Sequence, residues 1–92
     1  MNQTLHVRII SPQKLIFETE AESVSSKNSQ GNFDILFNHA NFITLIENSA
    51  LIVRVNKQKI MTFNFPLGIV FASDNKVNIY TYVFDTIKKE NN

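Results

Sequence analysis

The chain has 92 residues, of which 43% are hydrophobic and 18% charged, and its formal net charge is +1. This length suits one small domain, and the apolar share suits a packed core better than a disordered chain. The charge gives no electrostatic reason to expect nucleic acid or an anionic membrane surface as a partner. The absence of cysteine excludes disulfides, thiolate metal sites and a cysteine nucleophile.

The first residues, MNQTLHVRII, lack the basic and long apolar stretches of a signal peptide. No run in the sequence approaches the ~20 apolar residues that a membrane-spanning helix needs. The sequence therefore predicts a soluble, cytoplasmic chain.

Alternation of apolar and polar residues dominates the first half of the chain. Residues 4–10, TLHVRII, place Leu5, Val7 and Ile9 on one face, which predicts a half-buried strand. Further strands are predicted over residues 14–20, 22–26, 33–37 and 42–46, with turns or loops at 11–13, 27–32 and 38–41.

The second half continues in the same way. Strands are predicted over residues 51–55, 59–65, 68–72 and 77–82, with polar turns at 47–49, 56–58 and 73–76. Turn signals recur about every 8–12 residues, and no convincing helical stripe exceeds two turns. The sequence predicts an all-β protein, a small β-sandwich of roughly nine to ten short, mostly antiparallel strands.

The strand around residues 69–72, IVFA, is apolar on both faces. A strand of this kind is buried on both faces, whereas the outer face of a small sandwich is normally wet. The excess of apolar side chains therefore predicts a surface that another protein covers.

His39 is the first candidate for chemistry. A catalytic triad needs a nucleophile next to the histidine and a carboxylate behind it, and no nucleophile-elbow pattern surrounds any serine. A metal site would need more ligands, and His6 is the only other histidine. The favoured interpretation is a histidine that caps a turn by hydrogen bonding to the backbone.

Glu18, Glu20 and Glu22 alternate in the segment ETEAE, and alternate residues of a strand share one face. Paired carboxylates can act as acid and base on a sugar, but only in a cleft that shifts their pKa values. A solvated face that discourages pairing at the sheet edge is the favoured interpretation, and an interaction surface is the alternative.

The order of motifs resembles the N-terminal β-sandwich domain of the ε subunit of F-type ATP synthases, over about residues 5–82. LHVRIISPQKLIFETEAESV, from Leu5, resembles the family's opening strand, turn and second strand. QGNFDILFNHANFITLI, from Gln30, resembles E-G-x-x-G-I-L-P-G-H-A-P-L-L-T-x-L, chiefly through its glycine and its H-A-x-x-x-T block. LGIVFASDNKVNIY, from Leu67, resembles G-G-F-x-E-V-x-x-N-x-V-T-I-L.

Several positions depart from the family pattern. Asp34, Phe37, Asn38, Asn41 and Leu67 stand where the family has Gly, Pro, Gly, Pro and Gly. Asn32 stands where family members often carry an acid that faces the membrane rotor ring. The family usually continues into a C-terminal helical hairpin that inhibits ATP hydrolysis. This chain stops at residue 92, so inhibition by that route is expected to be absent.

The resemblance implies a non-catalytic rotor subunit that binds the foot of the γ subunit, and through it the α/β catalytic head. It also implies a location peripheral to the inner face of the cell membrane. It places His39, Ala40, Phe42 and Thr44 near γ, and Gln30, Gly31 and Asn32 in a loop that faces the ring. No catalytic residue, metal or cofactor is expected.

Residues 1–84 are expected to form the ε-like sandwich domain, and residues 85–92 a polar C-terminal tail. Two alternatives stay open at this point. One is an ε-like subunit of a divergent F-type-related ATPase motor that does not make ATP, which the altered Gly/Pro pattern motivates. The other is a free-standing β-sandwich that binds a ligand through the Glu18, Glu20 and Glu22 face or through His39.

Overall fold

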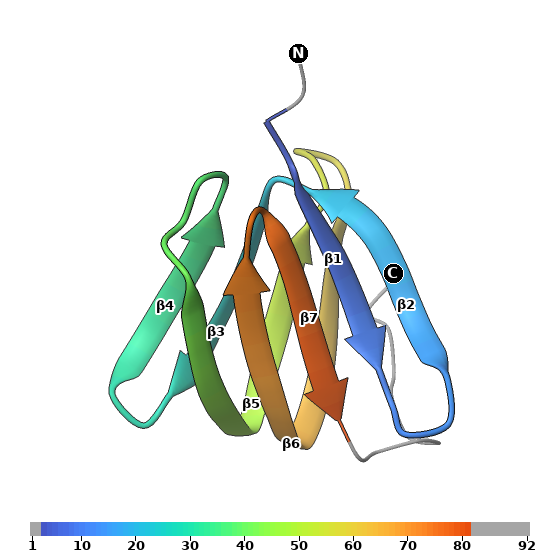
Figure 1. Ribbon diagram of the computed structural model, residues 1–92, viewed down its shortest axis with the longest axis vertical. Coiled ribbons are helices and arrows are strands. Elements are labelled where there is room, and N and C mark those ends of the chain that lie inside the picture. The colour runs from blue at the N-terminus through green and yellow to red at the C-terminus, as the bar shows by residue number, and fades with distance from the viewer. Residues whose placement is uncertain (1–2, 82–92) are drawn as a thin grey trace.

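The computed structural model describes residues 3–81, which form one seven-stranded sheet (Figure 1). The strands are β1 (Leu5–Ile10), β2 (Leu15–Ala21), β3 (Ser23–Asn28), β4 (Gly31–Leu36), β5 (Phe42–Arg54), β6 (Ile60–Ser73) and β7 (Lys76–Thr81). The all-β prediction is confirmed. Over the described residues no helix forms, and so none has the length and apolarity to cross a membrane. Tyr82 and the tail predicted at residues 85–92 lie outside the described residues.

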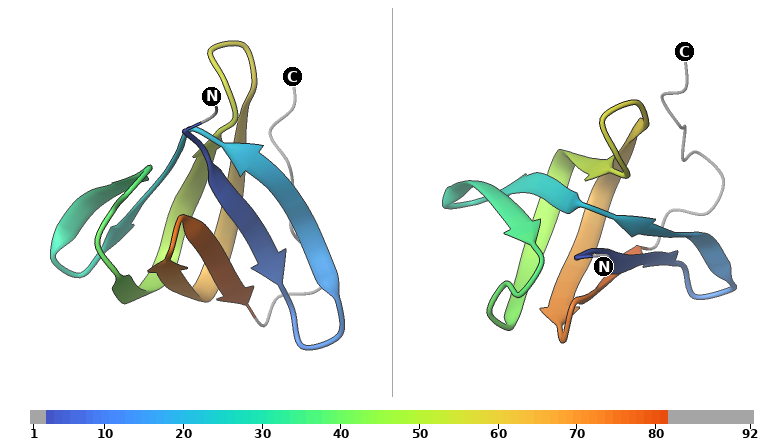
Figure 2. Two further views of the ribbon diagram at one scale, coloured as in Figure 1. Left: turned by 45° about the horizontal axis from the view of Figure 1, so that its top comes forward. Right: turned by 90° about the horizontal axis from the view of Figure 1, so that it is seen from above.

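The strands follow the order β2-β1-β7-β6-β5-β3-β4, and all neighbours are antiparallel except β1 and β7. The first strand thus lies beside the last, with Val7 opposite Val77. The β1–β2 and β3–β4 hairpins lie on opposite sides of the long β5–β6 ribbon (Figure 2). The sheet therefore curls around its own apolar residues instead of lying flat.

Strand β5 bends in its middle, and the bend reverses which face is buried. Ile46 is buried before the bend, whereas Leu51 and Val53 are buried after it, so the buried positions change from even to odd numbers. The change occurs around Asn48, whose φ of 50° is unusual for a residue other than glycine. The two halves of β5 therefore direct opposite faces of the strand into the core.

Strand β6 bends at the matching place. Phe63 and Phe65 are buried before Pro66, and Val70 and Ala72 after it, which is the opposite reversal. Proline has no N–H to donate to a ladder and so suits a bend. The predicted count of nine to ten strands is wrong. The turn expected at residues 47–49, and the break expected between strands at 59–65 and 68–72, are bends inside the continuous strands β5 and β6.

The core contains side chains from all seven strands. Its largest members are Phe63 and Phe65, each 1% exposed, whose rings stack with centroids 6.2 Å apart. Phe17 of β2 packs on Phe63 at 5.0 Å. Full burial of one such ring stabilises the fold by about 1.5–3 kcal/mol. Leu5, Val7 and Ile9 are buried as the alternation predicted.

Two loops at one end of the sheet are tied together. Asp74 and Asn75 both have positive φ, as the two-residue hairpin turn between β6 and β7 requires. The side chain of Asn75 accepts a hydrogen bond from the Asn38 N–H at 2.6 Å, and its amide donates to the Asn38 side chain at 3.3 Å. The connection between β4 and β5, which carries His39, is therefore held against the β6–β7 turn.

Candidate interaction surface

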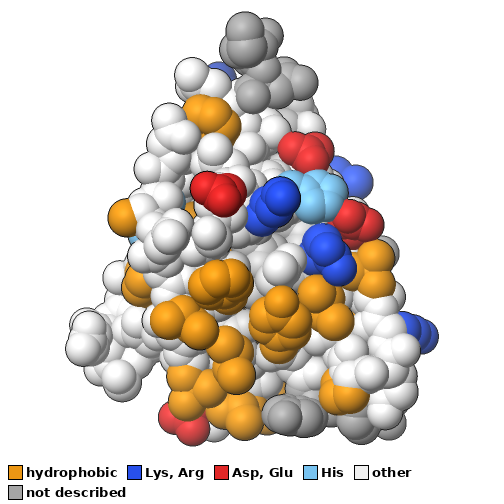
Figure 3. Space-filling view, viewed as in Figure 1, with side chains coloured by type: hydrophobic (Ala, Val, Ile, Leu, Met, Phe, Trp, Pro, Cys, Tyr) orange, Lys and Arg blue, Asp and Glu red, His pale blue; other side chains and the backbone are white. Residues whose placement is uncertain are grey.

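A contiguous group of exposed apolar side chains covers the outer side of β5, β6 and β7. We call this group the apolar face; it consists of Ile43, Leu45, Leu67, Ile69, Phe71 and Tyr80. Ile43 is 66% exposed, and the other members are 36–47% exposed. Figure 3 shows hydrophobic side chains gathered in the lower part of this view. Soluble monomers rarely expose large contiguous apolar patches, so the face is a candidate contact surface.

The strand register shows that the apolar face is continuous. Residues directly opposite one another on neighbouring strands point to the same side of a sheet. Leu45, Ile69 and Tyr80 form one such row, which ends on Ile10 of β1. Ile43 and Phe71 begin the next row. Ile69 and Phe71, from the apolar segment that the sequence singled out, thus belong to this exposed surface.

A notch interrupts the face at the ends of β1 and β7. Ile10, Pro12, Leu67, Ile69 and Tyr80 line most of it, and its volume is about 210 Å³. An engineered apolar cavity of about 150 Å³ holds a benzene molecule. The notch is therefore large enough for one apolar side chain of a partner.

A charged cluster borders the apolar face on β1 and β2. The ring of His6 lies between two carboxylates, with Nε2 2.5 Å from Glu18 and Nδ1 2.6 Å from Glu20. The hydrogen bonds with Glu20 and Glu18 raise the pKa of His6. The hydrogen bond with His6 lowers the pKa of Glu20. The Thr4 hydroxyl donates to the second oxygen of Glu20 at 2.8 Å. Both carboxylates are thus engaged by one imidazolium.

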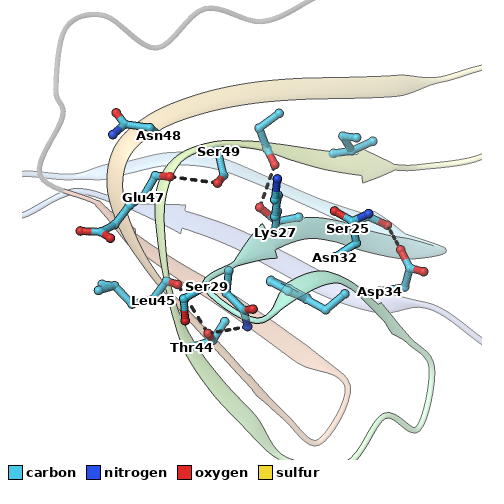
Figure 4. Close-up of a pocket in the computed structure, with 15 residues that line it drawn as sticks. Ser25, Lys27, Ser29, Asn32, Asp34, Thr44, Leu45, Glu47, Asn48 and Ser49 are labelled. Atoms are coloured by element: carbon cyan, nitrogen blue, oxygen red, sulfur yellow. Dashed lines mark hydrogen bonds between the residues drawn. The ribbon is translucent and has the colours of Figure 1, made fainter.

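A groove of about 1010 Å³, lined mostly by polar residues, opens between β5 and the β3–β4 hairpin (Figure 4). Leu45 of the apolar face also lines it. Strand β3 pairs with β5 only at residues 23–25, and beyond that point side chains bridge the gap. The Ser26 hydroxyl donates to the Ala50 carbonyl at 2.7 Å, and the Asn28 amide donates to the Thr44 hydroxyl at 3.0 Å. Polar residues thus predominate in the lining of the groove, and several of them are hydrogen-bonded within it.

The loop predicted to face a rotor ring lies at the tip of the β3–β4 hairpin, beside this groove. Asn28 organises it, because its side-chain oxygen accepts the Gln30 N–H at 2.8 Å. Gly31 has a φ of 124°, a backbone conformation that residues with a side chain rarely adopt, so the turn favours glycine here. Asn32 lines the groove. The structure therefore places Gln30, Gly31 and Asn32 together at the tip of the β3–β4 hairpin, beside the groove.

The residues predicted to lie near a γ subunit occupy the β4–β5 connection and the start of β5. His39 is exposed; its N–H donates to the Leu36 carbonyl at 3.0 Å and its Nδ1 lies 2.7 Å from the Ala40 carbonyl. Its ring stacks edge-on against Phe42. His39 is thus a turn residue bonded to the backbone, as the sequence indicated.

Phe42 and Thr44 point to the opposite side of β5 from the apolar face. The Phe42 ring packs edge-on against Phe33 at 5.2 Å, and Thr44 faces the groove. Their neighbours Ile43 and Leu45 are the exposed pair, and the sequence reasoning did not select them. The segment FITLI is apolar at four of five positions, so alternation alone gives no signal for which side faces outward.

The alternative uses of the glutamates and His39 find no support in the geometry. Glu18 and Glu20 are exposed and bonded to His6, and they line none of the hollows described above. Among residues 3–81, no three His, Asp or Glu side chains are arranged to hold a metal ion. The contact surfaces are therefore the strongest functional features of the described chain.

Comparison with known proteins places this fold. Residues 4–85 match the family described as "ATP synthase, Delta/Epsilon chain, beta-sandwich domain". The chain is 36% identical over 81 residues to the ATP synthase epsilon chain of Clostridium novyi, covering 86% of this chain and 60% of that one. It is 30% identical over 84 residues to the epsilon chain of Rickettsia bellii, covering 88% and 77%. The chain thus spans about 60% of the length of the first of these relatives.

Solved structures share the fold. A chain of the Euglena gracilis mitochondrial ATP synthase, in a structure of its OSCP/F1/c-ring, superposes with a TM-score of 0.80 at 14% identity. That likeness covers 90% of this chain and 53% of the other. A chain of the Tetrahymena thermophila central stalk and c-ring gives 0.72 at 19% identity, covering 90% and 67%.

Proposed function

Since the chain belongs to the family of ATP synthase delta/epsilon-chain β-sandwich domains, we propose that it is a non-catalytic rotor subunit of an F-type ATP synthase or ATPase. Its apolar face binds the γ subunit at the foot of the central stalk. The single observation that carries this assignment is the contiguous exposed apolar surface over β5, β6 and β7. Water contact with such a surface is unfavourable, and burial against a partner removes it.

The role is one of contact and not of chemistry. Both ring nitrogens of His6 are engaged by carboxylates, and Nδ1 of His39 is engaged by a backbone carbonyl. The notch in the apolar face supplies a seat for a buried side chain of γ, as expected at the centre of an interface. Transmission of rotation through this contact serves the α/β catalytic head indirectly.

The finer assignments belong to the same proposal. The tip of the β3–β4 hairpin, with Gln30, Gly31 and Asn32, faces the membrane rotor ring. His39, Ala40, Phe42 and Thr44 flank the γ contact from the β4–β5 connection. Residues 1–84 make up the sandwich domain and residues 85–92 a polar tail. The subunit lies in the cytoplasm, peripheral to the inner face of the membrane.

The test is binding of the purified chain to the γ subunit from the same organism. Ile43→Asp places a charge on the apolar face, and we expect it to weaken binding by about 100-fold. Ile60→Asp is the matched control, because Ile60 is 46% exposed at the far end of β6 and lies outside the face. If both variants bind γ as tightly as the unaltered chain, the apolar face is not part of the interface.

A second experiment separates a synthase from a divergent motor that does not make ATP. The tagged chain is recovered from its own cells in mild detergent, and the proteins that accompany it are identified by mass spectrometry. Recovery of γ, α and β subunits together with ring and stator proteins supports a synthase. Recovery of γ, α and β alone supports a repurposed motor, and recovery of none of them contradicts the proposal.

A further inference from the structure

Arg8 lies on the outer side of β1, at the border of the apolar face. It occupies the same row as Ile43 and Phe71, separated from Phe71 only by Asn78. Its Nε atom is buried and has no hydrogen-bond partner, and no ion pair joins its guanidinium to any of the described residues. A buried polar group without a partner is costly and rare, so the arrangement calls for a physical explanation.

The residues across the strands from Arg8 are engaged elsewhere. Glu18 stands directly opposite Arg8 on β2 and would be its natural ion-pair partner. The Glu18 carboxylate instead contacts Nε2 of His6 at 2.5 Å. On the other side, the Asn78 amide donates to the Tyr80 hydroxyl at 3.3 Å. Among residues 3–81, Arg8 Nε therefore has no acceptor although a carboxylate lies across the strand.

The histidine cluster holds this arrangement in place. His6 engages Glu20 as well as Glu18, and the Thr4 hydroxyl fixes Glu20 from the other side. Both glutamate side chains thus point toward His6, which lies two residues before Arg8 on β1. Within the described part of the chain, the contacts of His6 thus keep both carboxylates away from the Arg8 guanidinium.

Building on the proposed function, we propose that Arg8 is the polar specificity determinant of the apolar face and binds a carboxylate of the γ subunit. A guanidinium presents a planar fork of donors that suits a carboxylate in two parallel hydrogen bonds. A partner that covers the apolar face excludes water from Arg8, so the partner must supply an anion to offset the lost hydration.

The charges around the face favour a single carboxylate over a polyanionic surface. Glu18 and Glu20 lie on one border of the face, and Glu47 pairs with Leu67 at the opposite border. Lys76 of β7 stands opposite His6, which itself contacts Glu18 and Glu20, so cations and acids alternate around the face. These mixed signs suit the surface of a protein with one acid opposite Arg8 better than a uniform layer of phosphates. The partner is therefore a protein surface and not an anionic membrane.

The notch gives the partner a second feature. Ile10 lines the notch and stands two residues after Arg8 on the same side of β1. Side chains two positions apart on a strand are separated by about 7 Å. The matching surface of γ thus carries an apolar side chain for the notch and an Asp or Glu about 7 Å from it.

The test compares Arg8 variants in binding to purified γ, measured at several salt concentrations. Arg8→Met keeps the aliphatic stem and removes the charge, and we expect it to weaken binding by about 30-fold and to flatten the salt dependence. Arg8→Lys restores part of the affinity, and Arg8→Glu weakens binding further. Lys59→Met is the matched control, since Lys59 is exposed in the β5–β6 turn, and it leaves affinity unchanged.

A second readout separates recognition from a structural role. Because Nε has no partner in the isolated chain, Arg8→Met should leave its melting temperature unchanged or raise it. Replacing the acids of γ one at a time should then find one whose loss matches that of Arg8→Met and adds nothing to it. A lower melting temperature in Arg8→Met would overturn the recognition role.

The outcomes distinguish this inference from the proposed function. If Ile43→Asp weakens binding but Arg8→Met does not, the assignment of Arg8 is wrong and the γ contact stands. If the unaltered chain does not bind γ, the proposed function itself fails. If Arg8→Met weakens binding but no acid of γ couples to it, recognition of a γ carboxylate is overturned.

Discussion

Two surfaces on opposite sides of β5 differ in how they meet water. On one side Ile43 stands 66% exposed with apolar neighbours on β6. On the other side Thr44 faces a polar groove and accepts a hydrogen bond from Asn28 across it. The polar side chains of the groove can bond to one another or to water, so the groove is stable in solvent, whereas the apolar face is stabilised when a second protein covers it. Adjacent residues of one strand thus serve separate purposes.

The strongest way to test this division is to compare two phenylalanines of the same strand. Phe63→Ala removes a ring that is 1% exposed, and we expect the free energy of unfolding to fall by about 3–5 kcal/mol. Phe71→Ala removes a ring that is 40% exposed, and we expect a loss below about 1 kcal/mol. Urea unfolding of both variants measures the difference. Equal losses would mean that Phe71 belongs to the core and not to a contact surface.

Binding should show the reverse order for the two surfaces. Phe71→Ala truncates a large side chain of the apolar face, and we expect it to weaken γ binding by at least about 10-fold. Ser49→Ala changes the groove, where the Ser49 hydroxyl bonds only to the Glu47 carbonyl, and should leave γ affinity unchanged. Isothermal titration calorimetry of both variants measures this. A greater loss from Ser49→Ala would place the γ contact in the groove.

The groove can be weakened without touching the face. Asn28→Ala removes the hydrogen bonds to Thr44 and Gln30, and we expect a loss of about 1–2 kcal/mol with faster amide exchange in the hairpin tip. Asn32→Ala in the same groove is the control, because no side-chain hydrogen bond of Asn32 is seen. Unaltered exchange in Asn28→Ala would show that the hairpin is held by other contacts.

The smallest expected effect concerns the charged border of the apolar face. The pKa of His6 is raised in the fold, so its contribution to stability is complete below its usual value of 6.5 and is lost as pH rises through the raised pKa. The pKa of Glu20 is lowered, so its contribution is present above 4.5 and is lost as pH falls through the lowered pKa. The melting temperature of the unaltered chain, measured from pH 2 to 9, should therefore fall at the acid end and at the alkaline end. His6→Asn should flatten the alkaline side, and a profile identical to that of the unaltered chain would contradict the His6 contacts.

Much of the fold was predictable because the alternation in β1 reports burial directly. Leu5, Val7 and Ile9 are buried as the pattern predicted, and the hairpin turn at Asp74 and Asn75 carries residues that tolerate positive φ. The strand count was not predictable in the same way. The polar residues around Asn48 and the proline at 66 are typical of turns, but here the chain bends and continues in register.

The candidate site was also predictable only in part. The apolar excess around Ile69 and Phe71 indicated a covered surface, and the glycine and His39 block indicated the family. Two pairs of β5 residues could form the exposed surface, Phe42 with Thr44 or Ile43 with Leu45. Which pair does so depends on which side of β5 faces the core. That orientation is set by the bend at Asn48 and by packing against Phe33, which lies on another hairpin.

The sequence by itself determined that the chain forms strands and which turns join most of them, because alternation and turn residues act over short distances. The order of its motifs indicated the family to which it belongs. Only the tertiary structure decided which apolar side chains remain exposed and that Arg8 Nε has no partner among residues 3–81. Both depend on pairing between distant strands: β2 brings Glu18 to His6, and β7 brings Asn78 to the other side of Arg8. No local pattern encodes such a competition for partners, because it is resolved only when the curled sheet sets the strands side by side.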